Sequence, residues 1–220
     1  MAAAVFASCT DFFSTSLASW ASRHPDKLIP TVTPDNVEEL ITTAENNPDL
    51  SLSLLKKIQD AADEAYGDDK QKLQNAALEV AVNAAGVGHA VLAAAGELTT
   101  IGDAEHAKIL VKDSLDDMEN LEEASSILFD ILPAPNTQEF DDFVAFADPN
   151  DLALAAALLI AGEAKKDGDF DKHINDIGHD TPRSEPEKLA VEMAKAAMAR
   201  EDELSESIRD VLKGLNLISG

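Results

Sequence analysis

The residues best suited to bind a ligand form a short acidic run, Asp167-Gly168-Asp169-Phe170-Asp171. Aspartates at alternate positions are how a calcium loop begins to gather hard oxygen ligands around one ion. The rest of the EF-hand pattern is absent, because Lys172 stands where glycine is required and Gly178 where the bidentate glutamate belongs. Two interpretations stay open: an irregular Ca²⁺ or Mg²⁺ site centred on Asp167, Asp169 and Asp171, or a helix start capped by aspartates.

Histidines provide the other candidate ligands. His89 lies in the run Gly86-Val87-Gly88-His89-Ala90, where small neighbours leave room for a haem or pigment ring beside an axial ligand. A buried histidine that hydrogen-bonds to a neighbouring helix fits the same surroundings. His173 and His179 are six residues apart, so they could share a metal only if the chain turns between them. Apart from a divalent cation, no cofactor is expected.

The sequence carries no motif of a common enzyme class. It has no nucleophile elbow, no phosphate-binding glycine loop, no HExxH and no dinucleotide fingerprint. Glu97 and Glu163 each follow a glycine, and converging carboxylates would raise a pKa, but contacts between helix ends and loops explain them more simply. We therefore expect a protein that is not an enzyme.

Composition favours packed helices beneath an acidic surface. The chain has 220 residues, of which 45% are hydrophobic and 5% aromatic, and its formal net charge is −25. This length fits one domain or two small ones, and an alanine-rich apolar fraction favours helix over sheet. The negative charge opposes direct binding to nucleic acid, and it fits either a high-salt environment or an ordinary solvated exterior. Cys9 is the single cysteine, so the sequence excludes an internal disulfide framework.

These side chains are positioned by an all-α fold of about eight or nine helices. Spacing of apolar residues and capping signals support this prediction, whereas no segment alternates convincingly as a strand. No membrane span is expected, because the longest weakly charged run, 76–96, is dominated by alanine and glycine. Helices are expected after Thr33-Pro34, at about 50–66 (ending at Gly67), over 69–98 as one long helix or as two divided at Gly86 or Gly88, from Asp103, at 121–132, after Thr137, at 150–165 after Asp148-Pro149, and from Ser184 to Lys213.

Two segments, 78–113 and 144–179, match at an offset of 66 residues. In each, a Gly-Glu pair (Gly96-Glu97 and Gly162-Glu163) precedes a Gly-Asp pair (Gly102-Asp103 and Gly168-Asp169). Glycine would end one helix in the left-handed conformation and aspartate would cap the next. The pattern predicts two pseudo-repeated helical hairpins, and chance similarity between alanine-rich segments is the alternative.

Residues 1–24 differ from the acidic helical domain predicted over 33–220, and His24 to Pro34 reads as a linker. Four of the ten aromatic residues lie in this arm, and Asp11 is its only charge before Arg23. Helical spacing places the aromatic and aliphatic side chains on one face, which would dock on the chain's own core or on a neighbouring subunit. A transit peptide is another interpretation of this serine-rich start, although such peptides are usually rich in arginine. The arm's candidate interaction residues are Phe6, Phe12, Phe13, Leu17 and Trp20.

These observations predict a non-enzymatic structural subunit of a shell, coat or scaffold. It would pack through the arm and through a long final helix, by way of Leu204, Ile208 and Leu212, against copies of itself or another protein. The alternative is a cation-binding or cation-regulated helical module centred on the acidic run.

Overall fold

The computed structural model describes residues 29–88, 118–169, 172–173 and 184–209. Within these ranges it contains seven α-helices and one short 3₁₀ helix, and no strand. The all-α prediction is therefore confirmed for this part of the chain. The elements are α2 (Val37–Ala44), α3 (Pro48–Glu64), α4 (Gly67–Ala85), α7 (Leu121–Ile131), α8 (Gln138–Phe146), α9 (Pro149–Asp167), α11 (Glu185–Met198) and the 3₁₀ helix η2 (Glu201–Glu203).

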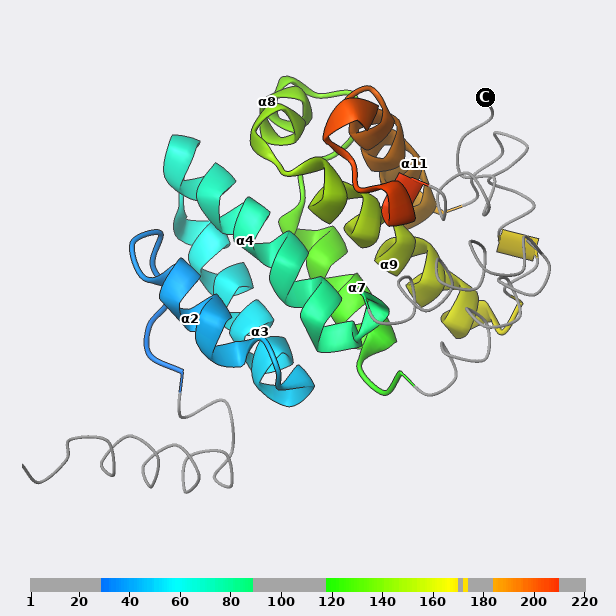
Figure 1. Cartoon of the computed structure of the whole chain (residues 1–220). Helices are drawn as coiled ribbons and strands as arrows, with labels where there is room; N and C mark the ends of the chain where they lie inside the picture. The colour runs from blue at the N-terminus through cyan, green and yellow to red at the C-terminus, as the bar shows by residue number, and fades with distance from the viewer. Residues whose placement is uncertain (1–28, 89–117, 170–171, 174–183, 210–220) are drawn as a thin grey trace, which may run out of the picture.

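Helices α4 and α9 lie at the centre of the bundle (Figure 1). Helices α2 and α3 pack on one side of α4, and α11 packs along α9 on the other. Helix α7 contacts α3, α4 and α9 and so joins the two halves. Every described helix thus buries a face against at least one neighbour.

The core between these helices is built mainly from leucine and alanine. Leucine fills the space between helix axes, and alanine lets the backbones approach. None of the described helices has the length and apolar character needed to cross a lipid bilayer. The largest fully buried side chains are Leu54, Leu55, Ile58, Leu73, Leu78, Leu121, Leu128, Phe143, Leu152, Leu158, Leu159 and Leu189.

Three predicted helix starts are confirmed with their caps. The Oγ1 of Thr137 accepts a hydrogen bond from the N–H of Phe140 at 3.1 Å, and the Oδ1 of Asp148 accepts one from Asn150 at 2.8 Å. Ser184 and Glu187 form a complete capping box at the start of α11. Each cap satisfies a backbone donor that the first helical turn leaves free.

The first two helix junctions differ from the sequence prediction. Helix α2 begins at Val37 rather than after Thr33, because the Oδ1 of Asn36 accepts the N–H of Thr33 and holds a turn before the helix. Asn47 caps α3, which starts at Pro48 rather than at about residue 50. Gly67 opens α4 instead of closing α3. Of the two alternatives for 69–98, the structure has the division at Gly86, which ends α4 with φ +73°.

Gly162 does not end a helix as predicted. It lies inside α9, which continues to Asp167 and ends at Gly168 with φ +70°. The two copies of the proposed repeat differ where they begin: residues 78–85 form the C-terminal end of α4, whereas the matching residues 144–151 cross the junction between α8 and α9. Most of the first copy lies outside the described ranges, so the repeat stays a prediction.

The long final helix predicted from Ser184 to Lys213 is wrong. Helix α11 ends at Met198, and η2 and an extended Leu204 separate it from a new helical turn at residues 206–209. Arg200 fixes this break, because its Nη1 donates to the carbonyl oxygens of Val144 at 3.2 Å and Ala147 at 2.7 Å. A guanidinium at the C-terminal end of α8 compensates carbonyl groups that the helix leaves without partners.

Candidate functional site

The acidic run starts at the C-terminal end of α9. Asp167 is the last helical residue, and the Oδ1 of Asp169 accepts a hydrogen bond from the N–H of Lys172 at 3.1 Å. This is the bond that an N-cap aspartate makes with the backbone three residues later. Asp171 lies outside the described residues, so a Ca²⁺ or Mg²⁺ site centred on the three aspartates stays a prediction.

His173 lies between two carboxylates contributed by different helices. Its Nδ1 is 2.5 Å from the Oε1 of Glu187 at the start of α11, and its Nε2 is 3.2 Å from the Oδ2 of Asp167 at the end of α9. His173 is 3% exposed and Glu187 is fully buried, whereas the Asp167 side chain is largely exposed. The other oxygen of Glu187 accepts the N–H of Ser184 at 2.8 Å. This cluster connects α9 with α11 across residues 174–183.

The hydrogen-bonding capacity of the two carboxylates limits which bonds His173 can form with them. A carboxylate can only accept, so both contacts are hydrogen bonds at once only when both ring nitrogens carry protons. Both nitrogens are thus directed at protein partners, an arrangement that fixes the imidazole in place. No group of three or more histidine, cysteine, aspartate or glutamate side chains among the described residues has the geometry of a metal site. The cluster is therefore best explained as a buried polar contact that positions the two helices.

A second group of carboxylates extends from α4 to the start of α9, which contacts α4. Partial burial, reinforced by the nearby charges of Asp148 and Glu79, raises the pKa of Asp151 to about 6. Burial and the charge of Glu45 also raise the pKa of Glu79. Like charges that share a partly dehydrated region disfavour each other's ionised form. The raised pKa of Asp151 makes the stability of the protein fall as the pH rises from about 4 to about 6.

Described residues in the first half of the bundle line three hollows. Two adjoining ones, of about 400 and 370 Å³, share Pro48 and Gly86 and have mixed polar and apolar walls. The third is a groove of about 40 Å³ between α2 and α3, which we call the Ile29 groove. None of the described residues that line this groove is charged; they are Ile29, Leu40, Thr43, Ala44, Leu50 and Leu54.

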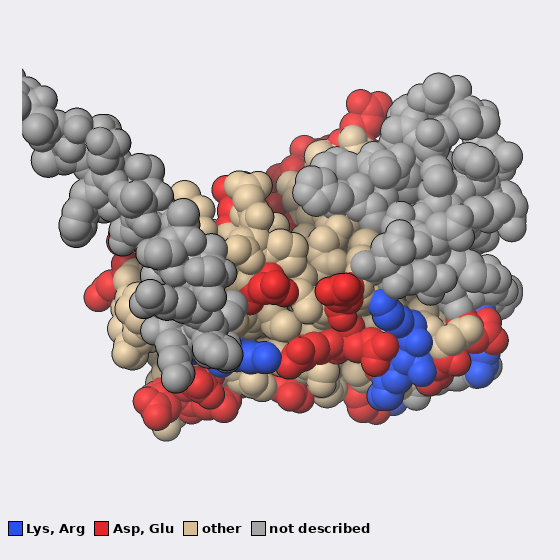
Figure 2. All heavy atoms as spheres, turned by 90° about the horizontal axis from the view of Figure 1, so that it is seen from below, with Lys and Arg blue, Asp and Glu red and all other residues tan. Residues whose placement is uncertain are grey.

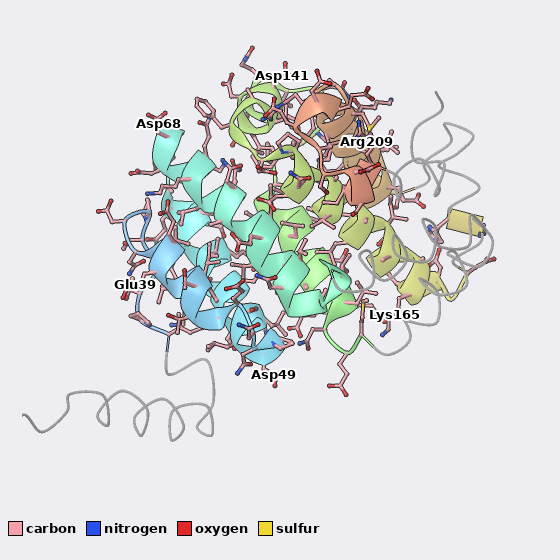
Figure 3. The ribbon with its side chains drawn as sticks, viewed as in Figure 1. Glu39, Asp49, Asp68, Asp141, Lys165 and Arg209 are labelled. Carbon is pink, nitrogen blue, oxygen red and sulfur yellow. The ribbon has the colours of Figure 1, made fainter. Side chains whose placement is uncertain are left out.

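Charged side chains cover the exterior of the helices. Figure 3 shows Glu39, Asp49, Asp68 and Asp141 on four different helices, all directed away from the core. In the face drawn in Figure 2, carboxylates predominate and the basic side chains gather mainly at one side. Two large hydrophobic side chains of the described chain are exposed as well, Tyr66 at 84% and Phe146 at 73%.

Two of the predicted interaction residues belong to the chain's own core. Leu204 is 6% exposed and Ile208 is 8% exposed, and both pack into the main hydrophobic cluster. They are buried because the break after Met198 turns the chain back onto the bundle, where the N–H of Ser205 donates to the Oδ1 of Asn150 at 2.8 Å. We therefore correct their assignment as docking residues. The other candidates, Phe6, Phe12, Phe13, Leu17, Trp20, His89 and Leu212, lie outside the described residues.

The His173 cluster was not predicted from the sequence. Glu187 was identified only as a capping residue and His173 only as a potential partner of His179. A glutamate in a capping box uses one oxygen for the backbone, and the other oxygen is free to accept from a second group. The capping-box spacing therefore indicates that Glu187 can accept a second hydrogen bond, but it does not identify the donor.

The chain matches no known family model, no curated protein and no solved structure in the comparisons. The function must therefore be argued from the residues themselves.

Proposed function

We propose that this chain is a non-enzymatic helical subunit that assembles with copies of itself through the arm, residues 1–24. The observation that carries the proposal is the division of charge along the chain. The arm holds one acidic and one basic side chain, Asp11 and Arg23, so the net charge of −25 falls on the remainder. Four of the ten aromatic residues lie in the same segment, whose side chains carry no net charge.

Electrostatic repulsion makes the arm the favourable place for contact. Two bodies of strong like charge repel at distances up to the Debye length, about 8 Å at physiological ionic strength. An apolar segment without net charge can approach an acidic neighbour with little electrostatic cost and can bury aromatic area there. A shell, coat or scaffold would use such an arm to connect subunits whose surfaces keep them soluble.

The described bundle supports restricting the proposal to the arm. Leu204 and Ile208 fill the chain's own core, so they are not offered to a partner. Leu212 and the rest of the C-terminal segment are not needed for the argument.

Multi-angle light scattering of the full chain at low and high salt tests this function. We expect a mass above that of one 23.4 kDa chain, and a larger fraction of assembled protein at high salt, because salt screens the repulsion. The variant Phe12→Ser/Phe13→Ser should shift the protein toward the monomer without changing its helical circular dichroism.

Phe146→Ser is the matched control, because Phe146 is an exposed aromatic residue on the described body. This variant should keep the wild-type mass. A wild-type chain that stays monomeric at both salt concentrations would refute the proposed function.

A further inference from the structure

The Ile29 groove differs from the surface around it. The six described residues that line it are aliphatic apart from Thr43. Neighbouring positions on the same helices carry Glu38, Glu39 and Asp49, which are exposed. The groove is therefore a small uncharged area on an otherwise acidic part of the bundle.

The described chain begins at this groove. Ile29 is both the first described residue and one wall of the groove, and the 28 residues before it include the arm. Only residues 25–28 separate the arm from Ile29, a length that spans at most about 14 Å when extended. The arm of every copy is thus tethered close to a groove that matches it in polarity.

We propose that the Ile29 groove receives the arm of a second copy of this chain, so that two copies exchange arms. This inference rests on the proposed function and adds the place where the arm binds. In the proposed function the arm leaves its own body to connect copies, so the groove that receives it belongs to a neighbouring copy. The contact is then reciprocal, as the twofold symmetry of a dimer requires.

The volume of the groove limits what enters it. About 40 Å³ holds the end of one apolar side chain rather than a whole helix. The rest of the arm would lie along α2 and α3 above the groove. A charge placed at the edge of the groove should therefore weaken the contact, because the entering side chain cannot solvate it.

Thr43→Arg introduces that charge, and Thr42→Arg is its matched control. Both threonines are exposed on α2, and each donates its Oγ1 hydroxyl to a carbonyl one turn earlier, Thr42 to Glu38 at 3.1 Å and Thr43 to Glu39 at 2.9 Å. Only Thr43 lines the groove. We expect Thr43→Arg to weaken self-association of the full chain about tenfold or more, whereas Thr42→Arg leaves it near the wild-type value.

Cross-linking identifies the occupant directly, because Cys9 in the arm is the single cysteine of the chain. A short bis-maleimide reagent applied to Thr43→Cys should give a much higher yield of covalent dimer than it gives with two controls. One control is the wild type, which carries only Cys9, and the other is Glu122→Cys, which places a thiol on the exposed side of α7.

The outcomes separate this inference from the proposed function. A cross-linked monomer would show that the arm covers its own groove, and a dimer yield no higher than background would exclude the groove as the docking place; either result overturns the inference. If the wild type assembles through Phe12 and Phe13 while Thr43→Arg has no effect, the proposed function holds and the inference fails. If the wild type is monomeric, the proposed function itself fails.

Discussion

Gly162 of α9 lies directly against Ser125 of α7. A Cβ atom added to Gly162 would be 2.3 Å from the Oγ of Ser125 and 2.4 Å from its Cβ. No ordinary contact is that short, so the absence of a side chain at residue 162 determines how closely α7 and α9 approach. These helices connect the two halves of the bundle.

We predict that Gly162→Ala destabilises the protein, although alanine in a helix interior normally stabilises by about 1 kcal/mol relative to glycine. Overpacking against Ser125 should reverse the sign and lower the free energy of unfolding by about 1–3 kcal/mol, measured by urea denaturation. Ser125→Gly in the same chain should recover most of the loss. If Gly162→Ala alone were as stable as the wild type, α7 and α9 would not pack this closely.

Asp151→Asn should stabilise the protein above pH 6. Because the pKa of Asp151 is raised to about 6 in the folded state, the unfolded chain releases this proton first as the pH rises, and stability falls between about pH 4 and 6. From the shift we expect a gain of about 3 kcal/mol at pH 7.5 that decreases to about 1 kcal/mol at pH 4.5. Asp141→Asn, on the exposed side of α8, is the control for removing one negative charge. If Asp151→Asn raised the free energy of unfolding equally at both pH values, the raised pKa of Asp151 would be wrong.

Glu187→Gln should destabilise the bundle by about 2–4 kcal/mol, because it leaves the buried His173 facing a neutral amide. Glu185→Gln is a matched control two residues earlier, since Glu185 makes only an exposed ion pair with Lys188. We expect that control to change the free energy of unfolding by less than about 0.5 kcal/mol. Two similar values from chemical denaturation would show that the histidine contact adds nothing to an ordinary surface charge.

Arg200→Ala should lower the free energy of unfolding by about 1–2 kcal/mol, through the loss of its hydrogen bonds to the end of α8. Its ion pair with Glu203 lies at the surface and should add little. Arg200→Lys would keep the charge but not the paired donors and should recover only part of the loss. If Lys195→Ala, which removes an exposed ion pair on α11, were equally costly, the contacts to Val144 and Ala147 would not be the cause.

Local signals predicted much of the fold. Thr137, Asp148 and Ser184 cap helices through bonds to backbone groups two or three residues away, so the sequence itself contains both partners. Gly86 was identified for the same reason, because a glycine after an apolar run commonly ends a helix. The start of α3 was predicted at about residue 50 rather than at Pro48, because asparagine and proline are typical of both sides of a short junction between helices.

Contacts between distant residues were not predictable. The helical role of Gly162 depends on Ser125, the break after Met198 depends on carbonyl groups more than 50 residues earlier, and His173 is placed by Glu187. Leu204 and Ile208 had the spacing of a docking face, yet the turn after α11 directs them inward. Periodicity shows that a side chain needs an apolar partner and leaves open which molecule supplies it.

Residues 200–208 pack against the junction between α8 and α9 and stabilise the bundle there. Arg200, Asn150 and Ser205 tie η2 to the junction between α8 and α9, while two aliphatic side chains enter the interior behind it. Any shortened version that stops at Met198 would open the interior to water and release the end of α8. The smallest autonomous folding unit of this chain must therefore extend past Ile208.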